Sequence, residues 1–272
     1  MIHPTAIVDP KARLDPSAQV GPYAVIDAGV EVGPDCLIGP HVYLTGQTTI
    51  GANNRFFAGC VIGEEPQDLK YRGEPTALRI GNHNVFREHV TVHRSSKPGE
   101  ETFIGSHNYL MQHSHVAHNV TLGDFVIVAG GALLAGYVSV ADRAFISGNC
   151  LVHQFVRVGT LALMQGGAAI SKDLPPFTAA HWYNTICGLN TVGLRRAGFT
   201  PPDRLELKRL YHALFRSGLN LRAALAKAQN EFSSPPARDM IDFLATSKRG
   251  VCRDAARGIA EEQDPSGRGS AE

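Results

Sequence analysis

A hydrophobic residue recurs at every sixth position through the first two-thirds of the chain. The series starts at Ile2 and ends at Ile170, and 26 of its 29 positions hold an aliphatic residue, Phe or Met; the exceptions are Asp68, Glu74 and Pro98. A spacing of six is too long for one helix or one strand, so it indicates a repeating unit. The pattern predicts a solenoid of short strands that stack their buried faces.

Two further columns accompany this series. The residue two places before each series position is usually small, with Ala at many places and Cys36, Cys60 and Cys150 at others. We therefore expect these three cysteines to be buried packing residues. The residue after the series position is often Gly, which we interpret as a turn that needs unusual dihedral angles: Gly21, Gly33, Gly39, Gly51, Gly63, Gly81, Gly105, Gly123 and Gly159.

The pattern divides the chain into regions. We assign 1–173 to the solenoid, interrupted by two polar loops at 63–79 and 93–103. Leu174 and the two prolines after it are expected to end the solenoid, because Pro cannot serve an interior ladder. Residues 174–199 are expected to connect it to a helical domain over 200–261, and 262–272 to form a disordered tail.

Helix signals are clear in the C-terminal region. Thr200 precedes two prolines and Asp203, which together predict a helix start, and Gly218 predicts the end of that helix. A second helix is expected over 219–232. After a turn at 233–236, a third is expected over roughly 237–248.

Composition narrows the class of protein. Lys and Arg number 26 and Asp and Glu 25, so the formal charge of +1 argues against a nucleic-acid coat. The chain has no apolar run long enough to span a membrane and no secretory leader pattern at its start. Five cysteines without CxxC spacing suggest neither a disulfide framework nor a zinc ribbon. We therefore expect a cytoplasmic protein.

The candidate chemistry lies where histidines cluster, in the run H-S-H-V-A-H over 113–118. If three hexads make one coil, then His118, Gly136 and Gln154 occupy one column on successive coils, flanked by Tyr137 and His153. A neutral imidazole can take a proton from an attacking hydroxyl. A glycine lets a substrate carbonyl approach a backbone N–H that stabilises an oxyanion. This combination suits acyl transfer by direct attack, since no Ser or Cys nucleophile stands beside the base.

Two other readings remain open at this point. The histidines could be inert surface residues, in which case the protein is a non-catalytic scaffold. They could also bind zinc, as in carbonic-anhydrase-like proteins of this kind of fold. However, His115 and His118 straddle an inward-facing residue and so point in different directions, whereas zinc needs three converging ligands. We therefore expect no metal site.

Several motifs resemble one family closely. The chain resembles the acyl-[acyl-carrier-protein]–UDP-N-acetylglucosamine O-acyltransferases that begin lipid A synthesis, from its start to about Gly250. The resembling segments are 67–71 (QDLKY), 73–76 (GEPT), 91–94 (TVHR), 114–118 (SHVAH), 152–155 (VHQF), 173–176 (DLPP), 193–196 (GLRR) and 198–199 (GF).

The resemblance implies a mainly β protein, a left-handed parallel β-helix with a C-terminal α-helical domain, working as a cytoplasmic homotrimer. It implies transfer of an (R)-3-hydroxyacyl group from acyl carrier protein to the 3-hydroxyl of UDP-N-acetylglucosamine. No cofactor is expected, because phosphopantetheine arrives on the carrier. By resemblance His118 is the general base and Gly136 the oxyanion donor, and further positions match residues that hold the sugar nucleotide or the acyl-phosphopantetheine chain: Asp68, Lys70, His115, His153, Gln154, Asn190 and Arg196.

Three residues and one segment depart from the family pattern. The segment 180–184 (AHWYN) is atypical and falls where the resemblance implies that the family measures acyl-chain length. Asn119 stands where Asp is common, and we expect it to orient the imidazole without stabilising imidazolium by charge. Tyr137 replaces a usual His, and Val192 replaces an acid expected near the nucleotide. These departures leave the reaction class in place and keep open an amino group as acceptor, with N-acylation of a UDP-amino sugar as the alternative.

Overall fold

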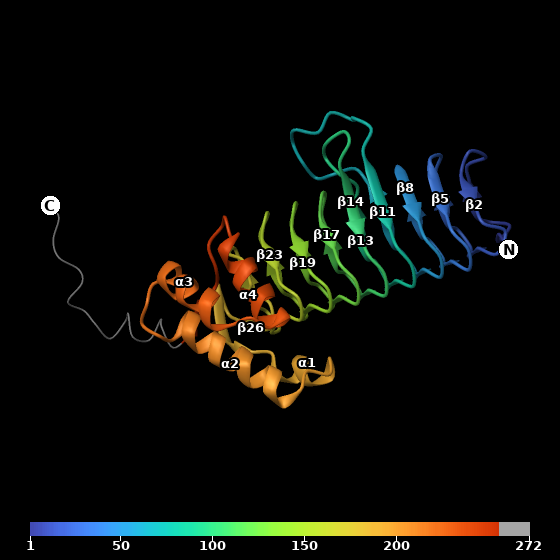
Figure 1. The fold of residues 1–272 in the computed structure, drawn as a ribbon. Helices are drawn as coiled ribbons and strands as arrows, with labels where there is room; N and C mark the ends of the chain where they lie inside the picture. The colour runs from blue at the N-terminus through green and yellow to red at the C-terminus, as the bar shows by residue number, and fades with distance from the viewer. Residues whose placement is uncertain (256–272) are drawn as a thin grey trace.

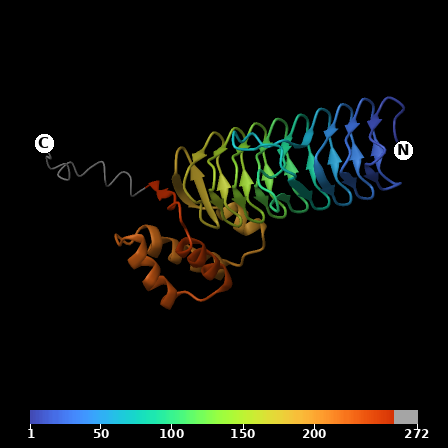
Figure 2. The same cartoon turned by 90° about the horizontal axis from the view of Figure 1, so that it is seen from above.

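The repeat builds a three-sided prism. The computed structural model describes residues 1–255, and its solenoid is a left-handed parallel β-helix. Figure 1 shows the coils advancing from the N-terminus toward the helices, and Figure 2 shows the helical domain set to one side of the far end. Most strands pair with the third strand further along the chain, so that Ile7 pairs with Val25 and Val25 with Tyr43. The predicted fold is confirmed.

Each face of the prism is one sheet. The first sheet contains β1 (Ile7–Val8), β4 (Val25–Ile26), β7 (Tyr43–Leu44), β10 (Val61–Glu64), β13 (Thr91–His93), β16 (His115–Val116), β19 (Leu133–Leu134), β22 (Leu151–Val152) and β25 (Ala169–Ile170). The second contains β2 (Arg13–Leu14), β5 (Val30–Val32), β8 (Gln47–Ile50), β11 (Ala77–Ile80), β14 (Glu101–Ile104), β17 (Thr121–Leu122), β20 (Ser139–Val140) and β23 (Arg157–Val158). The third contains β3 (Gln19–Val20), β6 (Leu37–Ile38), β9 (Arg55–Phe56), β12 (Val85–Phe86), β15 (Tyr109–Leu110), β18 (Ile127–Val128), β21 (Phe145–Ile146), β24 (Leu163–Met164), β26 (Thr178–His181), β27 (Thr185–Leu189) and β28 (Arg253–Asp254).

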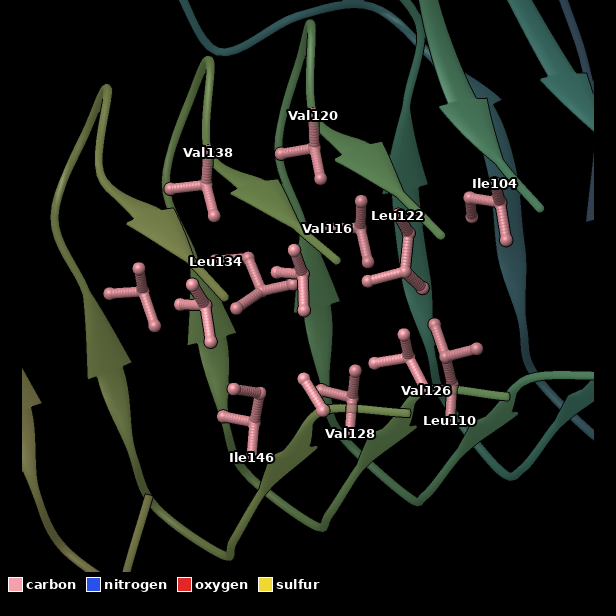
Figure 3. Packing of buried hydrophobic residues seen from close by; sticks show 14 of the residues in the cluster. Ile104, Leu110, Val116, Val120, Leu122, Val126, Val128, Leu134, Val138 and Ile146 are labelled. Carbon is pink, nitrogen blue, oxygen red and sulfur yellow. The ribbon is translucent and has the colours of Figure 1, made fainter. Parts of the chain in front are cut away.

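The six-residue series forms the core. Figure 3 shows its members pointing into the prism from all three faces, and Val116, Leu122 and Leu134 have no exposed surface. The small column is buried with them: Cys36, Cys60 and Cys150 are free thiols with 0% exposure, as predicted. Burial of each large aliphatic side chain stabilises the fold by about 1.5–3 kcal/mol relative to exposure.

The glycine column is a correction, because the predicted reason for it is wrong. Among its nine members only Gly63 has a positive φ. The others lie where coils approach closely: a Cβ on Gly81 would meet the carbonyl oxygen of Gly105 at 2.7 Å, and one on Gly39 would meet that of Phe56 at 2.7 Å. The left-handed conformation is instead adopted at the second residue of most corners, for example His113 (φ 57°) and Asn119 (φ 58°).

The two loops do not shift the six-residue register of the strands that follow them. An undisturbed coil contains three hexads, as between the paired residues Ile104 and Leu122. Five hexads separate the paired Ile50 and Ile80, and four separate the paired Ile80 and Ile104, so the loops insert two whole hexads and one. Strand β10 ends at Glu64, β11 begins at Ala77 and β14 begins at Glu101, so the loops proper span 65–76 and 94–100, shorter than predicted. Both rise from one edge of the prism (Figure 1).

The solenoid does not end on all faces at once. The prolines after Leu174 come after the last strands of the first two sheets, but the third sheet continues through the hairpin of β26 and β27. Buried Asp173 accepts hydrogen bonds from the Arg157 backbone N–H at 2.9 Å and its Nε at 2.9 Å, and from the Ser247 hydroxyl at 2.9 Å. This carboxylate therefore ties the last coil to the segment that follows the final helix.

The C-terminal helices are α1 (Thr191–Arg196), α2 (Pro201–Phe215), α3 (Leu221–Glu231) and α4 (Pro235–Ala245). The predicted start of α2 is confirmed, with a reciprocal capping box between Thr200 and Asp203. Helix α4 begins earlier than predicted, because its two prolines form the first turn behind the cap Ser234. Helix α1 was not predicted. The expected tail 262–272 and the end of the expected helical domain, 256–261, lie outside the described residues. Within 1–255, no helix is long and apolar enough to cross a membrane.

Candidate active site

The predicted column exists at one edge of the prism. His118 and Gly136 are the first residues of successive corners that follow β16 and β19, and Gln154 follows β22. The backbone N–H of Tyr137 donates to the carbonyl of His118 at 3.0 Å, and that of Phe155 donates to the carbonyl of Gly136 at 3.1 Å. The three residues therefore stack one coil apart, about 4.8 Å each.

Gly136 is required by space. A Cβ at this position would lie 2.6 Å from Cε1 and 2.7 Å from Nε2 of His118. The imidazole therefore lies directly over the glycine, and its Nε2 edge faces the backbone that the sequence pattern predicted as the oxyanion donor.

The backbone N–H at this corner position is not needed by the ladder between coils. Proline, which has no N–H, occupies the same place in early coils: Pro4, Pro10, Pro16, Pro22, Pro34 and Pro40. The N–H of Gly136 is therefore available to a ligand, next to the His118 ring.

Asn119 fixes the tautomer of His118. Its side-chain oxygen accepts a hydrogen bond from the Ser96 backbone N–H at 2.9 Å, so this atom is the oxygen of the amide. The same oxygen lies 2.9 Å from Nδ1 of His118, which must then carry the proton. Nε2 is left unprotonated in the neutral ring, which is the state that a general base requires.

Two further histidines lie beside His118. Burial lowers the pKa of His93 to about 4, assisted by the nearby His118 and Arg94. Burial likewise lowers the pKa of His115 to about 4, with His93 and His118 as smaller causes. The His93 and His115 rings meet edge to face at 5.0 Å. Both are therefore neutral near pH 7 and do not compete with His118 as charged groups.

The groove beside His118 has a volume of about 560 Å³. It contains five of the predicted site residues: His115, His118, Gly136, His153 and Gln154. Its floor is apolar, formed by β19, β22 and β25 with Leu133 and Leu151 partly exposed, and Tyr183, which pairs with Ala169 of β25, lines it beyond the last strand. The groove can therefore hold an apolar chain that ends at a polar centre.

The first loop reaches the groove through Gln67, which sequence reasoning did not select. The predicted Asp68 and Lys70 do not line it. The Asp68 carboxylate accepts from the Lys70 backbone N–H at 2.9 Å, which shapes the loop. The Lys70 side chain is exposed.

Asn190 and Arg196 lie elsewhere. They line a separate cavity of about 340 Å³ together with Phe125, Arg143 and Val192. The Asn190 side chain caps α1 by accepting from the Gly193 N–H at 2.9 Å, and it donates to the Leu161 carbonyl at 2.9 Å. A single chain therefore does not bring these two residues to His118.

The described residues hold no group of three or more His, Cys, Asp or Glu side chains placed to bind a metal ion. Nδ1 of His115 hydrogen-bonds the hydroxyl of Thr91 at 2.7 Å, whereas Nδ1 of His118 hydrogen-bonds the side chain of Asn119. The two rings therefore face different partners. Sequence reasoning missed Ser96, although the broken repeat did identify its loop. Tyr183 belongs to the atypical segment 180–184, and the structure places it in the lining of the groove.

Comparison with known proteins places the chain in a family. Residues 173–252 match the family described as UDP N-acetylglucosamine O-acyltransferase, domain 2, and residues 11–46 match the bacterial transferase hexapeptide, six repeats. The acyl-[acyl-carrier-protein]–UDP-N-acetylglucosamine O-acyltransferase of Thermodesulfovibrio yellowstonii is 43% identical over 255 residues, covering 93% of this chain and 99% of that protein. The enzyme of the same name from Halorhodospira halophila is 45% identical over 255 residues with the same coverage.

Comparison with a solved structure points to the same family. The Francisella novicida UDP-N-acetylglucosamine acyltransferase superposes with a TM-score of 0.91 at 33% identity, covering 99% of this chain and 100% of that one. Because the similarity to these proteins extends over nearly the whole chain, the chain belongs to the acyl-[acyl-carrier-protein]–UDP-N-acetylglucosamine O-acyltransferase family.

Proposed function

We propose that this protein moves an (R)-3-hydroxyacyl group from acyl carrier protein to the 3-hydroxyl of UDP-N-acetylglucosamine, the first step of lipid A synthesis, in the cytoplasm. The observation that carries the proposal is the placement of His118 Nε2 against the backbone of Gly136. Family membership adds the substrate classes, since the relatives are named for them.

The reaction follows from these two groups. Nε2 of His118 takes the proton of the sugar hydroxyl as its oxygen bonds to the thioester carbon. The carbonyl electrons move to oxygen, where the Gly136 N–H stabilises the negative charge. When the carbonyl re-forms, the carbon–sulfur bond breaks, and the phosphopantetheine thiolate takes the proton from the His118 imidazolium. Ester and free thiol are the products, and no cofactor is consumed.

The apolar part of the groove suits the acyl chain. Leu133 and Leu151 contribute exposed apolar surface beside the base, and Tyr183 lines the groove beyond the last strand. His115, His153 and Gln154 supply polar contacts around the reacting carbon. Gln67, beside Asp68 and Lys70, brings the first loop to the same groove.

A homotrimer would complete the site. Asn190 and Arg196 line a cavity separate from the His118 groove, so we assign them to the groove of a neighbouring copy. Acyl carrier protein, which is acidic, would approach the basic side chains on α2. There Arg204 and Lys208 line a cavity of about 460 Å³ next to β27.

The test is product formation by purified His118→Ala. We expect wild-type protein, given 3-hydroxyacyl carrier proteins of several lengths and UDP-N-acetylglucosamine, to give an O-acyl product by mass spectrometry. The H118A variant should lose at least about 10²-fold in kcat. His113→Ala is the matched control, because His113 belongs to the same motif but stacks on His89 outside the groove.

Two outcomes would contradict the proposal. Near-normal turnover by H118A would exclude His118 as the base. Acylation of a 3-amino UDP-sugar with no reaction of the hydroxyl substrate would support the alternative acceptor instead.

A further inference from the structure

Loop 94–100 places a carboxylate behind the base. The Asn119 amide nitrogen donates to Oε2 of Glu100 at 2.7 Å and to the hydroxyl of Ser95 at 2.7 Å. On its other side the amide oxygen bonds His118. His118, Asn119 and Glu100 therefore form one chain of hydrogen bonds from the groove to the loop.

The direction of every bond in this chain is determined. The Ser96 backbone N–H can only donate, and an ionised carboxylate can only accept. Both constraints give the Asn119 amide the same orientation, with its oxygen toward His118 and its nitrogen toward Glu100. This series of hydrogen bonds therefore runs from the His118 ring, through the Asn119 amide, to the negatively charged carboxylate of Glu100. A negative charge on this side of the ring stabilises the imidazolium.

We propose that Glu100 is a positioning residue for the reaction: it holds the Asn119 amide against His118 and supplies, through that amide, the negative charge that Asn119 itself lacks. This inference rests on the proposed function. It also revises the expectation that Asn119 could contribute orientation alone.

The size of the effect is limited by two features. The Glu100 side chain is 45% exposed, and the Lys97 ammonium lies 3.8 Å from its other oxygen. A charge two hydrogen bonds away from the ring, in surroundings between protein surface and water, changes an equilibrium by roughly five- to tenfold. Because the charge matters only once His118 is protonated, the loss should fall on kcat and leave KM nearly unchanged.

The decisive variant is Glu100→Gln, which can still accept from Asn119 through its amide oxygen but has no charge. We expect its kcat to be five- to tenfold below wild type. Glu101→Gln is the matched control: Glu101 is the next residue, has similar exposure and pairs with Arg79 away from Asn119. It should react at the wild-type rate.

A second variant separates charge from structure. In Glu100→Gln combined with Asn119→Asp, the charge moves one link closer to His118. The new carboxylate can accept from His118, from Ser96 and from the side-chain amide introduced by E100Q. Asp also tolerates the left-handed conformation of this corner. We expect kcat to return to wild type or above, whereas a purely structural role for Glu100 predicts no such rescue.

The tautomer is measured without substrate. In ¹⁵N NMR spectra of wild-type protein with a neutral ring, Nδ1 of His118 should give the protonated-nitrogen signal and Nε2 the unprotonated one. The reverse assignment overturns the proposal whether or not the protein has the proposed activity. With an active wild type, equal kcat for E100Q and E101Q overturns it, as does failure of the double variant to recover. An inactive wild type counts against the proposed function alone.

Discussion

Substitution of Gly136 by Ala tests the geometry of the site most directly. The added methyl carbon would lie 2.6 Å from Cε1 of His118, whereas ordinary contact begins at 3.4 Å. The imidazole must therefore retreat by about 0.8 Å, and its bond to Asn119 resists that movement. A displacement near 1 Å costs on the order of 10²-fold in rate, since proton transfer and attack need near-contact geometry. We expect G136A to lose about 10²-fold in kcat.

Gly166→Ala is the matched control for this variant. Gly166 occupies the same place in the corner of a later coil, but a Cβ there would meet only the Gly148 carbonyl oxygen, at the ordinary distance of 3.6 Å. Steady-state kinetics with acyl carrier protein thioester and UDP-N-acetylglucosamine give kcat and KM for both variants. Urea unfolding should show both folded. If G136A turns over as fast as G166A, the close contact between base and backbone has no part in the reaction.

Two further predictions concern stability. Between pH 7 and pH 5 the free energy of unfolding should fall by about 2 kcal/mol for each of His93 and His115. Their pKa values are about 4 in the fold and near 6.5 when unfolded, so the unfolded chain gains protons first as the pH falls. Urea midpoints that do not change with pH would contradict this. Leu134→Ala should cost about 3 kcal/mol, since Leu134 is fully buried, whereas Leu133→Ala, on the same strand with 42% exposure, should cost less than about 1 kcal/mol by the same measurement.

The fold was predictable because one period governs both sequence and structure. Val116 and Leu134 point inward because they are members of the six-residue series, and the loops do not disturb it because they insert whole hexads. The reason for the glycine column could not be predicted, because it depends on how closely adjacent coils approach at residues such as Gly81. The periodicity shows that glycine is needed at these positions, but not whether its small size or its conformational freedom is the reason.

The candidate site was predictable only where the repeat determines position. The column of His118 and Gly136 follows from counting residues. Glu100 does not, because it lies in a loop whose path is set by its own turns and by Asn119. The separation of Arg196 from His118 was also hidden, since it depends on where the hairpin and α1 leave the end of the prism.

The proline positions have a consequence for how such a site could arise. The corners of the coil start with a residue whose N–H the ladder between coils does not use, as Pro4, Pro10 and Pro16 demonstrate. Where another residue stands at this place and no side chain accepts its N–H, as at Gly136, the edge of the prism has a spare donor that the fold does not need. A base on one coil and a glycine on the next place a proton acceptor beside such a donor, and the loop at the same edge supplies the groups that orient the base. The scaffold therefore supplies the donor at no structural cost, and only the base, the glycine and the loop behind the base are particular to this site.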